Sequence, residues 1–225
     1  MPNIVRTAIC ACLFAALSQT ARGGEIYNVA VDTSALVGHP AGPFYVELAF
    51  TDGSGIGDAN NTVTLSDFDF GGGSALGSPL VFGGATGSLE TGVSITDSSF
   101  LSIFDEQFAP GLQLNFSLDL TSNDDADGIP DRLTLYLLDD SGTAIPTLAP
   151  GGANYFLGVD LGSAGAVFDV WGSDPTQAPY VGDPVSIAAP KVTSASSTPE
   201  PPAIYLLGGA LLATAAVTKS RLLAR

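Results

Sequence analysis

One short acidic segment, "NDDADGIPD" at residues 123–131, has the residue types and spacing for chemistry. Acidic or amide side chains recur at every second position and a glycine follows, which is the spacing of calcium-binding loops. Alternate oxygens in such a loop converge on a hard cation, the glycine permits a sharp turn, and a main-chain carbonyl adds a further oxygen. The predicted metal ligands are Asn123, Asp125, Asp127, the carbonyl of Ile129, and Asp131.

The match to a calcium loop is incomplete. The part "DGIPD" resembles the calcium-binding repeats of thrombospondin type 3, but Thr134 stands at the twelfth position, where a bidentate carboxylate is usual. Asp124, Asp139 or Asp140 could supply the missing carboxylate. The alternative interpretation is a polar hairpin loop whose acids face water. Calcium is therefore the candidate cofactor, with both interpretations open.

Residue types that carry most enzyme chemistry are scarce. His39 is the single histidine and lies in the turn-like "VGHPAG", and no serine has the G-x-S-x-G context of a hydrolase. Both cysteines, Cys10 and Cys12, lie near the N-terminus, so zinc sites built from His and Cys are not expected. A glycan hydrolase needs only two carboxylates, but the sequence singles out no pair. We therefore expect a protein that is not an enzyme.

Trp171, in "VFDVWGSDP", is the single tryptophan. Together with Tyr136, Tyr155 and Tyr180 it could form a flat platform for sugar rings, as on β-sandwich carbohydrate-binding modules. The alternative is that Trp171 caps the core at the end of a strand. A carbohydrate-binding module is thus the alternative function.

The elements that must position these residues are predicted to be β-strands. In "LQLNFSLDL", Leu112, Leu114, Phe116, Leu118 and Leu120 alternate with polar residues, which is the period of a strand with one buried face. The same alternation occurs in "FYVELAF", "RLTLYLL" and "NYFLGVDL", whereas in "TVTLSDFDF" it shifts phase, which predicts a bulge near Asp67. Eight to ten strands separated by Gly, Pro, Asn and Asp clusters indicate an all-β fold, an antiparallel β-sandwich of jelly-roll type.

Charge and length limit the classes of protein further. A chain of 225 residues suits one sizeable domain with short appendages. Between residues 25 and 198 there are 22 acidic residues against Arg132 and Lys191, so this segment has a net charge near 2 − 22 = −20. Nucleic acid is therefore excluded as an expected partner, because binding it requires Lys and Arg to neutralise phosphates.

The N-terminus has the three parts of a secretory signal peptide, assigned to residues 1–24. Arg6 precedes an apolar stretch from about Ala8 to Leu17, and small residues follow up to Gly24. A lipoprotein box ending at Cys12 is the alternative, but the apolar run before it is only about five residues long. We expect the protein to be exported.

The C-terminus combines a proline-rich linker, an apolar run and basic residues. Residues 25–190 are assigned to the sandwich, 191–198 to an exposed linker, and 203–218 to a transmembrane helix flanked by Lys219, Arg221 and Arg225. As a helix, the charge-free run 203–217 would span roughly 23 Å, which is short for a bilayer core of about 30 Å unless the basic residues snorkel.

Pro199-Glu200-Pro201, the apolar run directly after it and the basic end together resemble the PEP-CTERM sorting signal of Gram-negative bacteria, over residues 199–225. The resemblance implies recognition by an exosortase and removal of the tail near the Pro-Glu-Pro. "YNVAVDTSAL" also resembles the start of β-rich exported domains that carry this signal. The alternative is a plain membrane anchor that stays uncut.

These features together predict a non-enzymatic exported protein. It would be anchored in the inner membrane before processing, and then reach the cell surface or the extracellular matrix. Its acidic body would bind calcium and contribute to an exopolysaccharide matrix or biofilm. The expected partners are the exosortase and exopolysaccharide.

Overall fold

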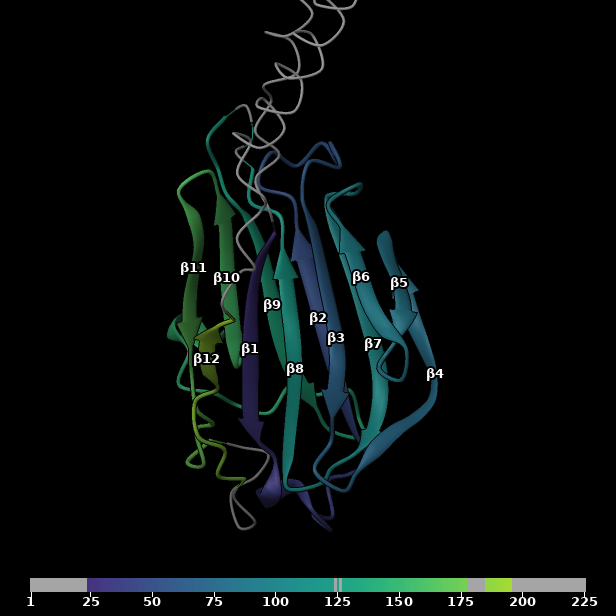
Figure 1. Cartoon of the computed structure of the whole chain (residues 1–225). Helices are drawn as coiled ribbons and strands as arrows, with labels where there is room; N and C mark the ends of the chain where they lie inside the picture. Colours follow the sequence, from purple (N-terminus) through teal and green to yellow (C-terminus); the bar gives the residue numbers. More distant parts are fainter. Residues whose placement is uncertain (1–23, 124, 126, 178–184, 196–225) are drawn as a thin grey trace, which may run out of the picture. The chain divides into compact units, whose positions relative to one another are not determined.

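The structure is a computed structural model that describes residues 24–123, 125, 127–177 and 185–195. These residues form two antiparallel six-stranded sheets stacked as a β-sandwich (Figure 1), and they contain twelve strands and no α-helix. The predicted all-β class and β-sandwich are confirmed. The chain divides into two compact units, Met1–Ala195 and Ser196–Arg225, and the second lies wholly outside the described residues.

The first sheet has the order β12-β1-β8-β3-β6-β5. Its strands are β12 (Lys191–Ser194), β1 (Glu25–Asp32), β8 (Gln113–Leu120), β3 (Thr62–Asp69), β6 (Gly92–Thr96) and β5 (Gly84–Ser88). The second sheet has the order β11-β10-β9-β2-β7-β4. Its strands are β11 (Gly165–Val170), β10 (Leu157–Gly162), β9 (Asp131–Leu138), β2 (Phe44–Thr51), β7 (Leu101–Ala109) and β4 (Ser74–Phe82). Two short 3-10 helices, Ser34–Leu36 and Pro150–Gly152, lie in connections.

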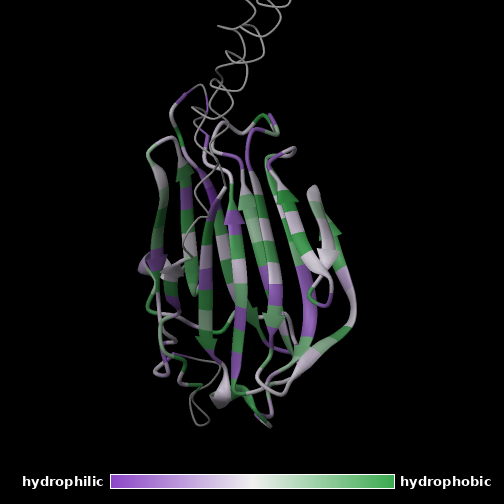
Figure 2. Cartoon of the chain, viewed as in Figure 1, coloured by the Kyte–Doolittle hydropathy of each residue, from purple (hydrophilic) through white to green (hydrophobic). Residues whose placement is uncertain are grey.

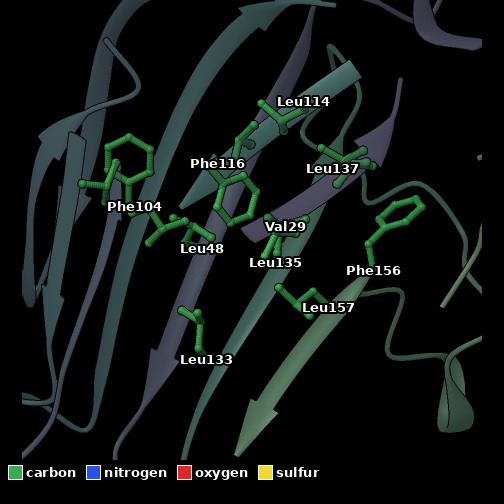
Figure 3. Packing of buried hydrophobic residues seen from close by; sticks show 14 of the residues in the cluster. Val29, Leu48, Phe104, Leu114, Phe116, Leu133, Leu135, Leu137, Phe156 and Leu157 are labelled. Carbon is green, nitrogen blue, oxygen red and sulfur yellow. The ribbon is translucent and has the colours of Figure 1, made fainter. Parts of the chain in front are cut away.

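The alternation of apolar and polar residues places one face of most strands in the core, and Figure 2 shows it as bands along the arrows. In β2 the side chains of Phe44, Val46, Leu48 and Phe50 are all buried, as predicted. Figure 3 shows side chains from both sheets, including Leu48, Phe104 and Phe116, meeting between the layers. Each fully buried Leu or Phe contributes about 1.5–3 kcal/mol of transfer free energy, so this layer holds the sheets together.

Two local expectations have different outcomes. The bulge predicted near Asp67 is confirmed, because the pairing of β3 with β8 shifts between Ser66 and Asp69 and Asp67 has a φ of 55°. Leu112, expected to point inward with its neighbours, is instead 67% exposed because β8 begins one residue later, at Gln113. Its main chain belongs to the turn that pairs with Gly71.

The residues assigned to the start of the linker form a strand. Lys191–Ser194 is β12, which pairs with β1 at the edge of the first sheet, with Tyr27 opposite Ser194. Val192 packs against the core, and Ala195 N donates a hydrogen bond to the carbonyl of Ile26. Small residues and a nearby proline predict a linker, but this prediction is wrong for 191–194, because edge pairing with β1 satisfies the main chain here. The sandwich therefore extends to Ala195.

Strand order brings several loops to one end of the sandwich. Antiparallel registers place Thr51 of β2 opposite both Arg132 and Leu101, and Val63 of β3 opposite Leu120. The connections β2–β3, β6–β7 and β8–β9 therefore converge at the same end, although they lie far apart in the sequence. The predicted calcium loop is the β8–β9 connection.

Candidate metal site

Five aspartates from these converging loops make up an acidic cluster. One oxygen each from Asp52, Asp125 and Asp131 lie within 4.8 Å of one another, and the same holds for Asp52, Asp58 and Asp97. Asp97, Asp52 and Asp131 are 0–1% exposed, Asp125 is 5% exposed and Asp58 is exposed. This acidic cluster could hold a metal ion, since carboxylate oxygens are the usual ligands of hard cations.

The sequence builds the cluster from strand ends. Asp52 follows β2, Asp97 follows β6, and Asp131 is the first residue of β9, so their main chains are fixed by the two sheets. Gly53 allows the β2–β3 and β8–β9 loops to pack closely, because a Cβ atom there would lie 2.4 Å from the carbonyl oxygen of Ile129. Any side chain at this position would push the two loops apart.

Asp52 is held by its own loop. Its Oδ1 accepts hydrogen bonds from Ser54 Oγ and Gly55 N, both at 2.7 Å, and its Oδ2 accepts one from Gly57 N at 2.6 Å. Burial opposes ionisation of Asp52, but these hydrogen bonds outweigh it and lower its pKa. Asp52 therefore stays a carboxylate.

Asp131 and Asp125 each accept two hydrogen bonds from the β2–β3 loop. Gly53 N donates to Asp131 Oδ1 and Asn61 Nδ2 to Asp131 Oδ2, both at 2.8 Å. Asp125 Oδ2 accepts from Ser54 N at 2.7 Å and its Oδ1 from Asn60 Nδ2 at 2.6 Å. Burial raises the pKa of Asp125 despite these donors, and the negative charges of Asp131 and Asp58 add to the rise.

Asp97 is the least satisfied member. Only its Oδ2 accepts a hydrogen bond, from Asn61 N at 3.0 Å, and its buried Oδ1 has no partner within the described part of the chain. Burial raises the pKa of Asp97 to about 7, and the neighbouring carboxylates of Asp131 and Asp58 contribute. A bound cation would remove this unfavourable electrostatic interaction.

Basic side chains do not neutralise the cluster in the described residues. The two basic residues there are Arg132 and Lys191. The Arg132 guanidinium binds Asp160 at 2.6 Å and Asp169 at 3.0 Å on the outer face of the second sheet, and Lys191 belongs to the edge strand β12. The carboxylates of the cluster therefore repel one another unless protons or metal ions intervene.

The structure places two of the five predicted ligands, Asp125 and Asp131, in the acidic cluster. Asn123 is exposed and its Nδ2 donates to the carbonyl of Asn60 at 2.7 Å. Asp127 is exposed too and accepts a hydrogen bond from Ile129 N, and the Ile129 side chain is 53% exposed. Asn123 therefore joins its loop to the β2–β3 loop, and the bond from Ile129 N to Asp127 lies within the β8–β9 turn.

Sequence reasoning missed Asp52, Asp58 and Asp97. Asp52 and Asp58 bound the segment "DGSGIGD", one of the glycine-rich clusters that separate the predicted strands, and its glycines are typical of a turn. Its alternating polar spacing from Asp52 through Ser54, and again from Asp58 to Asn60, was the available signal. Asp97 is a single acidic residue between two predicted strands, so the sequence around it contains no such signal.

The other candidate residues lie away from this cluster. Trp171 follows β11 and is absent from the apolar core cluster; its Nε1 donates to Asp169 at 3.4 Å. His39 Nδ1 accepts a hydrogen bond from Ala41 N within its turn. The predicted signal peptide (residues 1–23 of it), Tyr180, Asp124, the Pro199-Glu200-Pro201 motif and the flanking Lys219, Arg221 and Arg225 lie outside the described residues.

Within the described ranges, no helix is long and apolar enough to cross a membrane. The predicted helix 203–218 falls outside those ranges. Comparison of the chain with protein-family models, curated proteins and solved structures found no match.

Proposed function

We propose that this is a non-enzymatic, exported surface or extracellular-matrix protein whose sandwich is stabilised by calcium. The observation that carries the proposal is the buried convergence of Asp52, Asp125 and Asp131 without a basic partner among the described residues. The site offers oxygen ligands and no imidazole or thiolate, which favours calcium over zinc or copper. Binding would hold the β2–β3 and β8–β9 loops together at one end of the sandwich.

We propose further that the sandwich is a jelly roll. Three of its strand pairs, β1 with β8, β2 with β7 and β3 with β6, join strands whose numbers add to nine. A long hairpin folded over on itself produces this pattern, with its strands divided between two sheets. In this interpretation β9, β10, β11 and β12 are additions at the sheet edges.

The route to the cell surface is proposed from the chain's ends. A signal peptide would export the chain, the tail would anchor it in the inner membrane, and an exosortase would cut near Pro199-Glu200-Pro201. The folded body would then contribute to an exopolysaccharide matrix or biofilm. Its excess of acidic residues supports this site of action, because divalent cations can bridge it to other anionic polymers.

The tail prediction is tested on protein recovered from the cells that make it. Mass spectrometry of the surface and medium fractions is expected to find a C-terminus near residue 200 and to find no peptide containing "RLLAR". Deletion of the exosortase gene is the control and should restore the intact end. An intact "RLLAR" terminus in wild-type surface protein would contradict processing.

Carbohydrate binding is the second candidate function. Tyr45 and Tyr136 lie on strands of the second sheet at positions that alternate with core residues, and Trp171 bonds to Asp169 beside Arg132. All three aromatic side chains are partly exposed, so their rings are accessible for stacking on sugars. This outer face also carries Glu47, opposite Asp105.

A pull-down with the host's exopolysaccharide distinguishes this candidate. Trp171→Ala is expected to reduce retention at least tenfold, which corresponds to a loss of about 1.4 kcal/mol, while the melting temperature shows that the fold survives. Phe82→Ala is the matched control, since Phe82 is 59% exposed on β4, at the opposite edge of the second sheet. Equal retention of wild-type protein and both variants would contradict a sugar site at Trp171.

A further inference from the structure

The half of the acidic cluster around Asp97 has ligand atoms that the proposed calcium site leaves unused. Asp97 is 0% exposed, and its Oδ1 has no hydrogen-bond partner within the described part of the chain. Its carboxylate lies with those of Asp52 and Asp58 in a group whose oxygens are within 4.8 Å of one another. A buried carboxylate oxygen without a donor is unfavourable unless the group is protonated or a cation binds it.

Asn60 connects this group with the proposed calcium site. Its Nδ2 donates to Asp58 Oδ2 at 3.1 Å and to Asp125 Oδ1 at 2.6 Å, so the amide lies between the two groups. The Oδ1 of Asn60 is buried and has no partner in the described ranges. Asp97 and Asn60 thus each have one buried oxygen without a donor among the described residues, and both oxygens are of the kind that calcium prefers.

Charge also points to more than one ion. The cluster contains five carboxylates, and a single divalent cation bound by Asp52, Asp125 and Asp131 would leave Asp58 and Asp97 uncompensated. The negative charge of Asp131 also acts on Asp97, and the described residues give neither of these buried acids a basic partner. A cation on the Asp97 side would compensate both.

We propose that a second divalent cation, calcium in the first instance, binds between Asp52, Asp58 and Asp97, so that Asp52 bridges two ions. This inference rests on the proposed calcium site at Asp52, Asp125 and Asp131 and extends it. The second ion attaches the β6–β7 loop to the β2–β3 loop, just as the first attaches the β8–β9 loop. Together the two ions hold all three loops.

The experiment is a count of bound calcium on the full-length protein. Equilibrium dialysis with radioactive calcium after chelation is expected to find two ions per wild-type chain. Asp97→Asn and Asp125→Asn should each bind one ion, because each removes a carboxylate that belongs to one group only. Asp58→Asn should also bind one, and since Asp58 is exposed this variant keeps the core of the cluster intact. Asp127→Asn is the control and should still bind two.

The outcomes separate this inference from the proposed function. One ion in the wild type, unchanged in Asp97→Asn and Asp58→Asn but lost in Asp125→Asn, would overturn the second site and leave the first. No bound calcium in the wild type would overturn both. Two ions in wild type and in Asp97→Asn alike would show that Asp97 is not a ligand.

Discussion

Calcium at a hundred times its dissociation constant is expected to raise the melting temperature of the metal-free protein by about 5–11 °C for each site that it fills. A ligand that binds only the folded state at this concentration adds about 2.7 kcal/mol per site, and each kcal/mol shifts the melting temperature of a protein this size by roughly 2–4 °C. The physical source is the mutual repulsion of Asp52, Asp125 and Asp131, which a cation replaces by attraction. Calorimetry with calcium and with a chelator measures the difference.

Two substitutions test whether the acidic cluster is responsible. Asp131→Asn should reduce the calcium-dependent rise to that of a single site, because it removes a buried ligand of the site at Asp52, Asp125 and Asp131 and leaves Asp52, Asp58 and Asp97 in place. Asp127→Asn makes the same chemical change at an exposed residue of the β8–β9 loop that only caps a turn, and should keep the rise. Identical melting temperatures of the wild type in calcium and chelator, at equal ionic strength, would contradict the site.

The metal-free protein is expected to lose stability as the pH rises from about 4 to 7. Several buried acids have a pKa in the folded state above their ordinary value, and burial raises that of Asp97 from 3.8 to about 7. The folded state therefore binds more protons than the unfolded state between these two values, so the free energy of unfolding falls as the pH rises through this window. Melting temperatures measured in chelator across this pH range test whether stability falls, as expected, or rises.

Glu106 provides a variant for this pH dependence outside the acidic cluster. Its side chain is 3% exposed on the core-facing side of β7, where burial raises its pKa despite a hydrogen bond of 2.6 Å from Leu89 N to its carboxylate. Glu106→Gln keeps an acceptor for Leu89 N but cannot ionise. It should raise the melting temperature by a few degrees near pH 8, where the buried carboxylate must ionise, and leave it almost unchanged near pH 4, below the ordinary pKa of the side chain. Asp140→Asn, at an exposed position, is the control and should show the same dependence of melting temperature on pH as the wild type. If Glu106→Gln lost melting temperature with pH as steeply as the wild type, the role of Glu106 would be contradicted.

The strands were predictable because their pattern is local. The alternation of apolar and polar residues in 44–50 and 114–120 predicts directly which side chains are buried. The bulge at Asp67 is also visible in the sequence, as a shift in the phase of this alternation. Strand β5, "GATGS", and strand β12, "KVTS", are short and poor in large apolar residues. Their pairing depends on neighbours distant in sequence, so periodicity alone could not reveal them.

Only the part of the candidate site that lies within one sequence motif could be predicted, because the rest depends on contacts between distant segments. Asp125 and Asp131 belong to one contiguous motif, whereas Asp52 and Asp97 reach them only because β2, β6 and β9 place their ends together. The motif's spacing suggested a self-contained loop in which Asn123 and Asp127 also bind. In the structure the partners of Asp125 and Asp131 come from the β2–β3 loop, which the local spacing does not encode.

The pairing of β12 with β1 determines how the sandwich would respond to a pull on its C-terminal side. Ser194 lies opposite Tyr27, close to the start of β1, and the two strands run antiparallel. Tension applied through Ala195 would therefore separate the pairs one after another, beginning with Tyr27 and Ser194, instead of stretching the whole ladder at once. With only four residues in β12, this is the shorter of the two edge pairings of the first sheet, since β5 pairs with β6 at five positions.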